Sequence, residues 1–246
     1  TAISFKKECA PVPGLEFART IHSPDDFGVS LAAARAAAWA NLAAKPPGQR
    51  RVALVLSDYP GAAGQAAHAV GLDALASTTE ILSHLSAAGY ETGSVPEPGA
   101  LARLLCEAEP QPFLMLDEYR RLFSKLPETA QAQVAQAWGE PEADPAARDG
   151  ELHLRFLRSG NFVIAVQPDR GSSHDRKASY HDPDLPPRHA YIAFYLWLAA
   201  RASVDAMVHL GTHGTLEWLP GKAVALSRTC FPAMLTGAVP VIYPFI

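Results

Sequence analysis

The stretch VDAMVHLGTHGTLEWLPGK, residues 204–222, carries the clearest fold signal in this chain of 246 residues. Its first part, 204–210, is short and mostly apolar, which is typical of a buried strand. Gly211 and Gly214 then allow the unusual φ values of a sharp turn, and 215–219 predicts a short helix. A strand that turns directly into a helix is a building unit of α/β folds.

The same alternation of strand and helix signals extends away from this stretch. Strands are predicted by the apolar runs RVALVLSDY, FLMLD, NFVIAVQP and VPVIYPF, and helices by 77–89, about 117–138 and 189–202. We therefore expect an α/β fold in layers, with a mostly parallel sheet flanked by helices. Ligand sites in such folds gather at the carboxyl ends of strands, and Leu210 marks such an end.

The length of the chain fits one large domain or two lobes. The segment GEPEADPAARDG at 139–150 is rich in residues that break regular structure, so it is the best candidate for a boundary. We expect an N-terminal α/β lobe at 1–145 and a C-terminal α/β lobe at 146–246 that carries HLGTHGTLEWLPGK. Because the chain starts at Thr1 and stops in a strand-like run, we also expect a piece of a longer protein.

Composition narrows the classes of function. A formal net charge of −4 gives no broad basic surface, so we expect no nucleic-acid partner. The longest apolar run, at 190–200, is far shorter than the roughly 20 residues of a transmembrane helix. The spacing of the three cysteines fits neither a metal-binding pair nor a disulfide framework. This pattern predicts a protein of the reducing cytoplasm.

The tripeptide PGK at 220–222 resembles the end of a phosphate loop. That motif needs four residues between its two glycines and Ser or Thr after the lysine. Here six residues separate Gly214 from Gly221, and Ala223 follows Lys222. The sequence therefore predicts no ATP site of this type, and any ATP would be hydrolysed by another chain.

The helix predicted at 77–89 contains Ser77, Glu80 and His84, which together suggest a catalytic site. Ser77 and Glu80, however, have the spacing of a capping box, and Gly89 is a typical helix terminator. We favour the structural interpretation, in which Ser77 is the N-cap of this helix.

Five of the nine histidines fall between His174 and His213, and two of them lie in the opening stretch. His209, His213 and Glu217 are spaced by four residues. A fully extended backbone would hold the two imidazoles roughly 13 Å apart, too far to share one ion, so the glycine turn must bring them together. We predict a metal site of His209, His213 and Glu217. For Glu217, a capping bond to the N–H of Gly214 is an equally good interpretation.

Two further segments contain polar side chains that a binding pocket needs. YHDPDLPPRH at 180–189 is stiffened by prolines and holds His181, Arg188 and His189, while QPDRG at 167–171 places Arg170 after a strand. These residues are candidates for the wall of a pocket that binds carboxylates. The alternative is a proline-rich connection with solvated charges.

Taken together, these motifs resemble those of a known family. HLGTHGTLEWLPGK, preceded by VQPDRG and YHDPDLPPRHAYIAFYLWL, is similar to the CobN-type large subunits of cobaltochelatases and to the H subunits of magnesium chelatases. RVALVLSDYPG and AVGLDALASTTEILSHLSAAGY extend the resemblance over most of the chain, and 91–150 contributes little. The magnesium branch usually carries GMHGT, so Thr212 favours the cobalt branch.

The resemblance implies a large subunit that inserts Co2+ into hydrogenobyrinic acid a,c-diamide during aerobic cobalamin synthesis. It also implies two AAA+ partner subunits that hydrolyse the ATP. Within it, His209, His213 and Glu217 become metal-binding and catalytic residues, with Glu217 as acceptor of a ring proton. The residues expected to bind the tetrapyrrole are Arg170, His181, Arg188, His189, Trp218 and Lys222.

Three alternatives to this function stay open. The chain fits a magnesium chelatase H subunit that acts on protoporphyrin IX, or a module that binds tetrapyrrole without catalysing insertion. It also fits a zinc-dependent hydrolase with His209, His213 and Glu217 as ligands.

Overall fold

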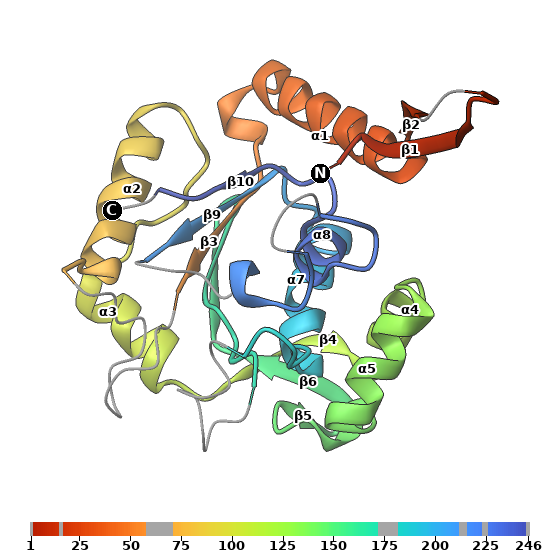
Figure 1. The fold of residues 1–246 in the computed structure, drawn as a ribbon. Helices are drawn as coiled ribbons and strands as arrows, with labels where there is room; N and C mark the ends of the chain where they lie inside the picture. The colour runs from red at the N-terminus through yellow and green to blue at the C-terminus, as the bar shows by residue number, and fades with distance from the viewer. Residues whose placement is uncertain are drawn as a thin grey trace.

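The computed structural model describes residues 2–14, 17–57, 71–171, 182–211, 216–222 and 226–244. Its centre is a five-stranded sheet in the order β10-β9-β3-β8-β7 (Figure 1). The strands are β3 (Val52–Leu56), β7 (Phe156–Ser159), β8 (Phe162–Val166), β9 (Ala206–Leu210) and β10 (Val241–Ile242). Four of them run parallel, and β7 is an antiparallel edge strand. This mostly parallel sheet confirms the predicted fold class.

The middle strand, β3, shows why the sequence forms this sheet. Its five residues, VALVL, are all buried, and such continuous apolar runs are typical of parallel strands covered on both faces. β3 pairs with β8 on one side and with β9 on the other. The sheet therefore combines strands from both sides of the boundary predicted near residue 145.

Helices cover both faces of the sheet. On one face, Ala53 and Val55 join a core with α7 (His189–Ala200), α4 (Leu116–Phe123), α5 (Glu128–Trp138) and α8 (Phe231–Thr236). On the other face, Val52, Leu54 and Leu56 pack against α2 (Ala74–Ala87) and α3 (Pro98–Ala102). Because side chains alternate along a strand, β3 contributes to both cores.

A second, smaller sheet lies below the first in Figure 1. It is antiparallel, in the order β4-β6-β5, and consists of β4 (Gln111–Met115), β5 (Ala147–Arg148) and β6 (Glu151–Leu154). Short helical turns connect other elements: Pro47–Gln49, Arg103–Glu107, Pro141–Ala143 and Leu216–Trp218. Among the described helices, none is long and apolar enough to cross a membrane.

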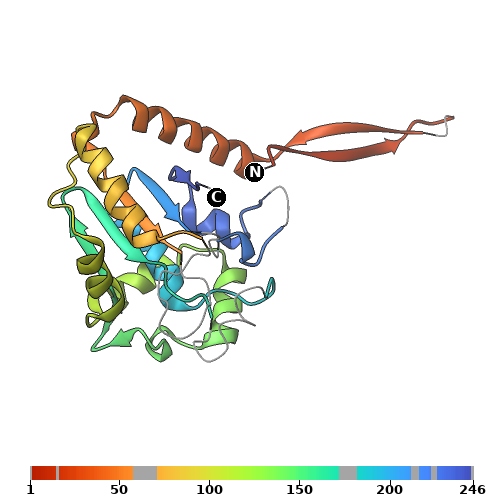
Figure 2. The same cartoon turned by 90° about the vertical axis from the view of Figure 1, so that its left-hand side faces the viewer.

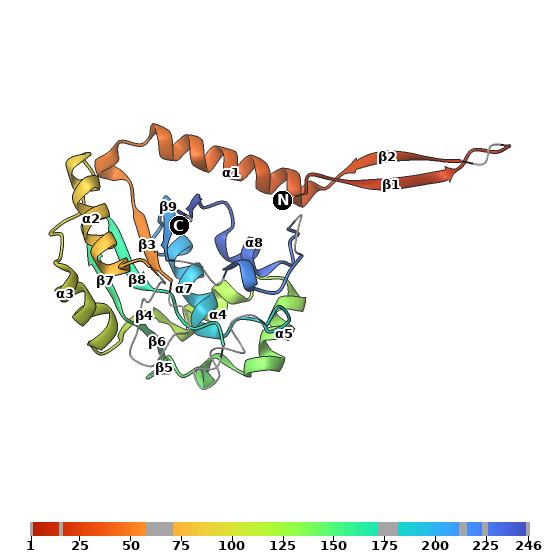
Figure 3. The ribbon, with the colours of Figure 1, turned by 60° about the vertical axis from the view of Figure 1, so that its left-hand side comes forward.

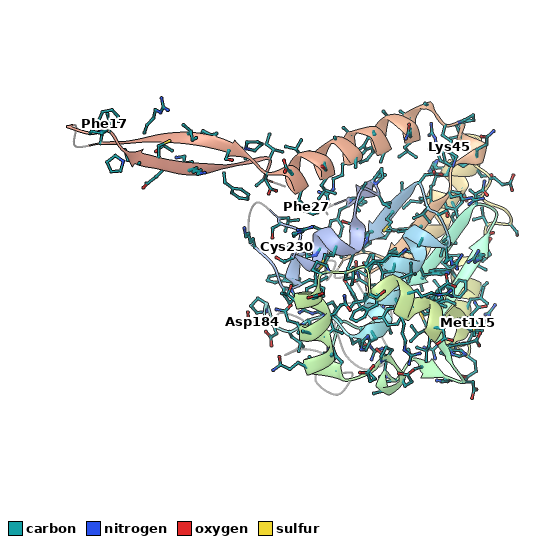
Figure 4. All side chains as sticks on the ribbon, turned by 90° about the vertical axis from the view of Figure 1, so that its right-hand side faces the viewer. Phe17, Phe27, Lys45, Met115, Asp184 and Cys230 are labelled. Carbon is teal, nitrogen blue, oxygen red and sulfur yellow. The ribbon has the colours of Figure 1, made fainter. Side chains whose placement is uncertain are left out.

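Two strands near the N-terminus form an arm outside these layers. β1 (Ser4–Pro11) and β2 (Ala18–Pro24) make a two-stranded antiparallel hairpin that projects away from the body (Figures 2 and 3). Phe17 lies near the end of this arm (Figure 4). The following helix, α1 (Asp26–Ala44), returns to the body, where Lys45 pairs with Asp205 at 2.6 Å. Phe27 packs beside Cys230 in a small core cluster (Figure 4).

The structure also corrects two local predictions. The helix predicted from Ser77 begins three residues earlier, because the side chain of Asp73 caps it by accepting the N–H of Ala76. The capping-box interpretation of Ser77 is therefore wrong. The single helix predicted at about 117–138 is two helices, α4 and α5, and the residue before α5 is Pro127.

Candidate functional site

The carboxyl ends of the parallel strands bring together four residues from distant parts of the chain. His209 is the penultimate residue of β9. Ser57, Gln167 and Tyr243 directly follow β3, β8 and β10, respectively. Parallel strands end at the same edge of a sheet, so these residues form one neighbourhood. This edge is where the sequence predicted a ligand site.

The chain leaves β9 through a glycine that the packing requires. The N–H of Ser57 donates to the carbonyl of Leu210 at 2.7 Å, which holds the ends of β3 and β9 together. Gly211 has a φ of +144°, and a Cβ there would lie 2.6 Å from the Cβ of Ser57. Any larger residue would push the two strand ends apart. The turn predicted at Gly211 thus has a physical cause, while Gly214 lies outside the described residues.

His209 is fully buried between two tyrosine rings. Its ring is stacked on Tyr195, with centroids 6.0 Å apart, and it also contacts Tyr243 at 5.7 Å. Among the described residues, neither Nδ1 nor Nε2 has a hydrogen-bond partner. Burial lowers the pKa of His209 to about 4. At neutral pH the imidazole is therefore uncharged, which is the form that binds metal ions.

The ring stacked on His209 is held from behind by a buried amide. Gln167 donates through Nε2 to the hydroxyl of Tyr191 at 3.1 Å and to that of Tyr195. Burial raises the pKa of Tyr195 well above its ordinary value, so this hydroxyl stays protonated. Neither Gln167 nor Tyr195 was predicted from the sequence. For Gln167, the available signal was a polar residue directly after an apolar strand.

Glu217 reaches the same neighbourhood from the short helix Leu216–Trp218. It is exposed, and its Oε1 accepts a hydrogen bond from the Tyr243 hydroxyl at 3.4 Å. Burial and then the charge of Glu217 raise the pKa of Tyr243. Since Tyr243 also contacts the ring of His209, it connects the predicted base to the predicted ligand. Tyr243 was not predicted from the sequence.

The rest of the predicted metal site is not described. His213 lies outside the described residues, and so does His181. Within the described ranges, no three His, Cys, Asp or Glu side chains come together as a metal-binding group. The set of His209, His213 and Glu217 therefore stays a prediction, of which the structure places His209 and Glu217 on either side of Tyr243.

Arg170 is buried and binds the protein's own backbone. Its guanidinium donates to the carbonyls of Trp218 at 2.6 Å, Asp182 at 2.7 Å and Leu185 at 2.6 Å. These bonds tie the short helix that carries Glu217 to the proline-rich segment before α7. Arg170 thus positions two walls of the site, and its predicted contact with substrate stays a prediction.

His189 has a different environment from His209. Its Nε2 donates to the carbonyl of Gly139 at 3.0 Å, and its Nδ1 accepts from the hydroxyl of Tyr119 at 2.7 Å. Burial lowers the pKa of His189, against the opposing effects of Gly139 and Asp144. The contacts of His189 are therefore with α4 and the end of α5, and the structure does not bring it to His209.

Comparison with known proteins gives the family. Residues 1–246 match the family described as CobN/Magnesium Chelatase. The chain belongs to the CobN/magnesium chelatase family. It is 42% identical to the aerobic cobaltochelatase subunit CobN of Sinorhizobium sp, over 100% of this chain and 20% of that protein. The CobN subunit of Pseudomonas aeruginosa is 43% identical over 90% of this chain and 19% of its own length.

A solved structure supports the same assignment. The catalytic subunit of cobaltochelatase from Mycobacterium tuberculosis superimposes with a TM-score of 0.80 and 36% identity, over 99% of this chain and 21% of that one. This chain spans about a fifth of the length of the CobN proteins that it matches.

In this member of the CobN/magnesium chelatase family, two of the remaining predicted residues lie at the surface and a third, Arg188, does not. Trp218 is 36% exposed beside Glu217. Lys222 is also exposed, and its Nζ lies 5.5 Å from the ring of Phe5 in the hairpin arm. Arg188 is mostly buried, with Nε 3.8 Å from the carboxylate of Asp144. The structure thus places Trp218 close to Glu217, and Arg188 on a separate wall.

Proposed function

We propose that this chain is part of the large subunit of an ATP-dependent cobaltochelatase. The whole subunit would insert Co2+ into hydrogenobyrinic acid a,c-diamide in aerobic cobalamin biosynthesis, with AAA+ partner subunits that hydrolyse ATP. The observation that carries the proposal is His209, a buried, uncharged imidazole whose nitrogens have no partner among the described residues. In a chain of this family, it is the best-formed metal ligand that the described residues offer.

Two arguments favour cobalt over magnesium within the family. Imidazole binds Co2+ readily, whereas Mg2+ prefers oxygen ligands. Two relatives that are more than 40% identical to this chain are named cobaltochelatase subunits. A magnesium chelatase H subunit remains the second candidate, because one family contains both.

The chemistry of insertion assigns separate tasks to the residues at the sheet edge. The ion must lose water, and two ring nitrogens must lose their protons. His209 offers a lone pair to the ion without first releasing a proton, because burial keeps its pKa at about 4. Glu217 is exposed at the same edge and accepts a ring proton. The exposed indole of Trp218 stacks on the macrocycle.

The first test is Glu217→Gln in the full-length subunit, assayed with its partner subunits. This change keeps the shape of the side chain and removes the base, so the rate of cobalt insertion should fall roughly a hundredfold. Binding of the metal-free ring, followed by its absorbance, should be retained. Glu128→Gln, a matched change of an exposed glutamate in α5, should leave both properties unchanged.

Three other outcomes would contradict parts of this proposal. An unchanged insertion rate in Glu217→Gln refutes the role of Glu217. Ring binding without any insertion by the complete complex favours a binding module. Tight binding of Zn2+ with no affinity for either ring favours a metal-dependent hydrolase.

A further inference from the structure

A cavity lies at the same edge of the sheet, beyond the end of β8. Its volume is about 320 Å³, which is within the range of sites that hold small ligands or parts of larger ones. The residues Val166 to Asp169 form one wall, and the other lining residues come from 105–113, from 145–155, which includes β5 and β6, and from the start of α7. Neither His209 nor Glu217 lines it, so it is separate from the site described above.

The lining of this cavity is strongly basic. Among the described residues, its charged lining consists of Arg148, Arg155, Arg188 and one acid, Asp169, and His153 lines it too. The cavity therefore has an excess of two positive charges in a chain whose net charge is −4. Such a concentration of guanidinium groups favours an anionic ligand.

The contacts of these groups within the protein leave some of their hydrogen-bonding atoms available to a ligand. Arg148 is 53% exposed, and its nearest carboxylate, Glu109, is 3.9 Å away at the surface, so that pair is weak. The Nε of Arg188 is 3.8 Å from Asp144 and makes no hydrogen bond within the described residues. The buried Nδ1 of His153 likewise has no partner there. Buried polar groups without partners are expensive, and a ligand would satisfy them.

The position of the cavity relates it to His209. β8 is two strands away from β9, which corresponds to about 10 Å across the sheet. Gln167 lines the cavity, and its amide also holds Tyr195, the ring stacked on His209. A flat ligand whose centre lay near His209 would thus extend its rim toward the basic cavity.

We propose that this basic cavity binds a peripheral carboxylate of the tetrapyrrole substrate. The inference rests on the proposed function, because a macrocycle with acidic side chains is the ligand that would span both sites. Arg148 and Arg188 bind the carboxylate, and His153 donates or accepts at its edge. Phe113 and Leu154 supply the apolar part of the wall.

The test compares two rings on the full-length subunit: hydrogenobyrinic acid a,c-diamide and an analogue in which every remaining carboxylate is amidated. Arg148→Glu should weaken binding of the acidic ring roughly tenfold and leave the amidated ring unchanged. His153→Gln should show a smaller loss with the same selectivity. Arg121→Glu, the same charge change at an exposed position of α4, should alter neither ring.

The other outcomes separate this inference from the proposed function. Equal losses for both rings in Arg148→Glu, or no loss, overturn the carboxylate subsite while the chelatase function stands. Binding of inorganic phosphate or acetate that Arg148→Glu abolishes, with ring binding unchanged, makes the cavity a site for free anions and also overturns the inference. A wild-type subunit that binds neither ring overturns the proposed function and the subsite with it.

Discussion

Two histidines are buried in the part of the chain that the structure describes, and they differ in their hydrogen bonding. His189 is 2% exposed and His209 is fully buried, so the two residues are similarly buried. Both nitrogens of His189 are hydrogen-bonded, to Tyr119 and Gly139, whereas neither nitrogen of His209 has a partner among the described residues. Two similarly buried imidazoles therefore differ in whether their nitrogens are hydrogen-bonded.

This difference teaches how to interpret a buried polar group. A buried nitrogen without a partner costs free energy, so its presence needs an explanation. For His189 the fold supplies the partners, and the residue joins α7 to α4 and to the end of α5. For His209 the missing partner is a ligand under the proposed function. Four experiments break or sharpen this contrast.

The largest expected difference concerns metal handling. His209→Leu in the full-length subunit should lower the rate of cobalt insertion roughly a hundredfold, because under the proposed function the change removes a metal ligand. His189→Leu should keep the insertion rate per folded molecule, because His189 does not contact the edge of the sheet. Insertion is measured by the absorbance change of the corrinoid ring, with the folded fraction determined in parallel. Equal rates in His209→Leu and wild type would remove His209 from the site.

Stability should show the reverse order. His189→Leu leaves the Tyr119 hydroxyl and the Gly139 carbonyl without partners, which costs about 2–3 kcal/mol. His209→Leu removes a ring that is itself unsatisfied, so its cost should be below about 1 kcal/mol. Amide hydrogen exchange of peptides from α7 and β9, measured by mass spectrometry on the full-length subunit, gives both local free energies. A larger loss in His209→Leu would mean that His209 is the structural histidine.

The sequence predicts much of the fold because its central signals are local. The five apolar residues of β3 and the strand-to-helix turn at Gly211 follow from composition and spacing alone. The strands β5 and β6 were missed, since β5 has only two residues and neither shows a clear alternation. The spacing of Ser77 and Glu80 predicts a cap at Ser77, yet Asp73 lies at the true start of the helix.

The candidate site is less predictable, because its properties depend on residues far apart in the chain. The sequence does not show that His189 is hydrogen-bonded within the fold, because its partner Tyr119 lies 70 residues away. Glu217 was predicted, but its connection to Tyr243 depends on the place of β10 at the edge of the sheet. Composition identifies the residue types, whereas the fold determines which of their polar groups have hydrogen-bond partners.

The third experiment uses pH. The folded pKa of His209 is about 4, below the value of about 6.5 for an unfolded histidine, so the unfolded state binds the proton first. The stability that comes from the neutral ring is complete above pH 6.5 and decreases as the pH falls toward 4. Between pH 7 and pH 5, local opening of β9 should become easier by about 2 kcal/mol in the metal-free subunit.

A matched variant isolates the histidine in this pH experiment. Hydrogen exchange of β9 peptides is followed at both pH values and corrected for the intrinsic exchange rates. His209→Phe keeps an aromatic ring between Tyr195 and Tyr243 but cannot bind a proton, so its pH dependence should be smaller by that amount. The same slope in wild type and His209→Phe would show that another group titrates.

The smallest effects come from removing single hydroxyl groups beside each histidine. Tyr119→Phe makes His189 resemble His209, because Nδ1 loses the hydroxyl that donates to it while the ring stays buried. Local stability around α4 should fall by about 1 kcal/mol, with cobalt insertion unchanged. Tyr243→Phe removes a 3.4 Å bond to Glu217 and should change insertion less than about threefold, with stability unaffected. If Tyr119→Phe reduced insertion more than Tyr243→Phe did, the two histidines would belong to one functional unit, and hydrogen-bond satisfaction would not separate them.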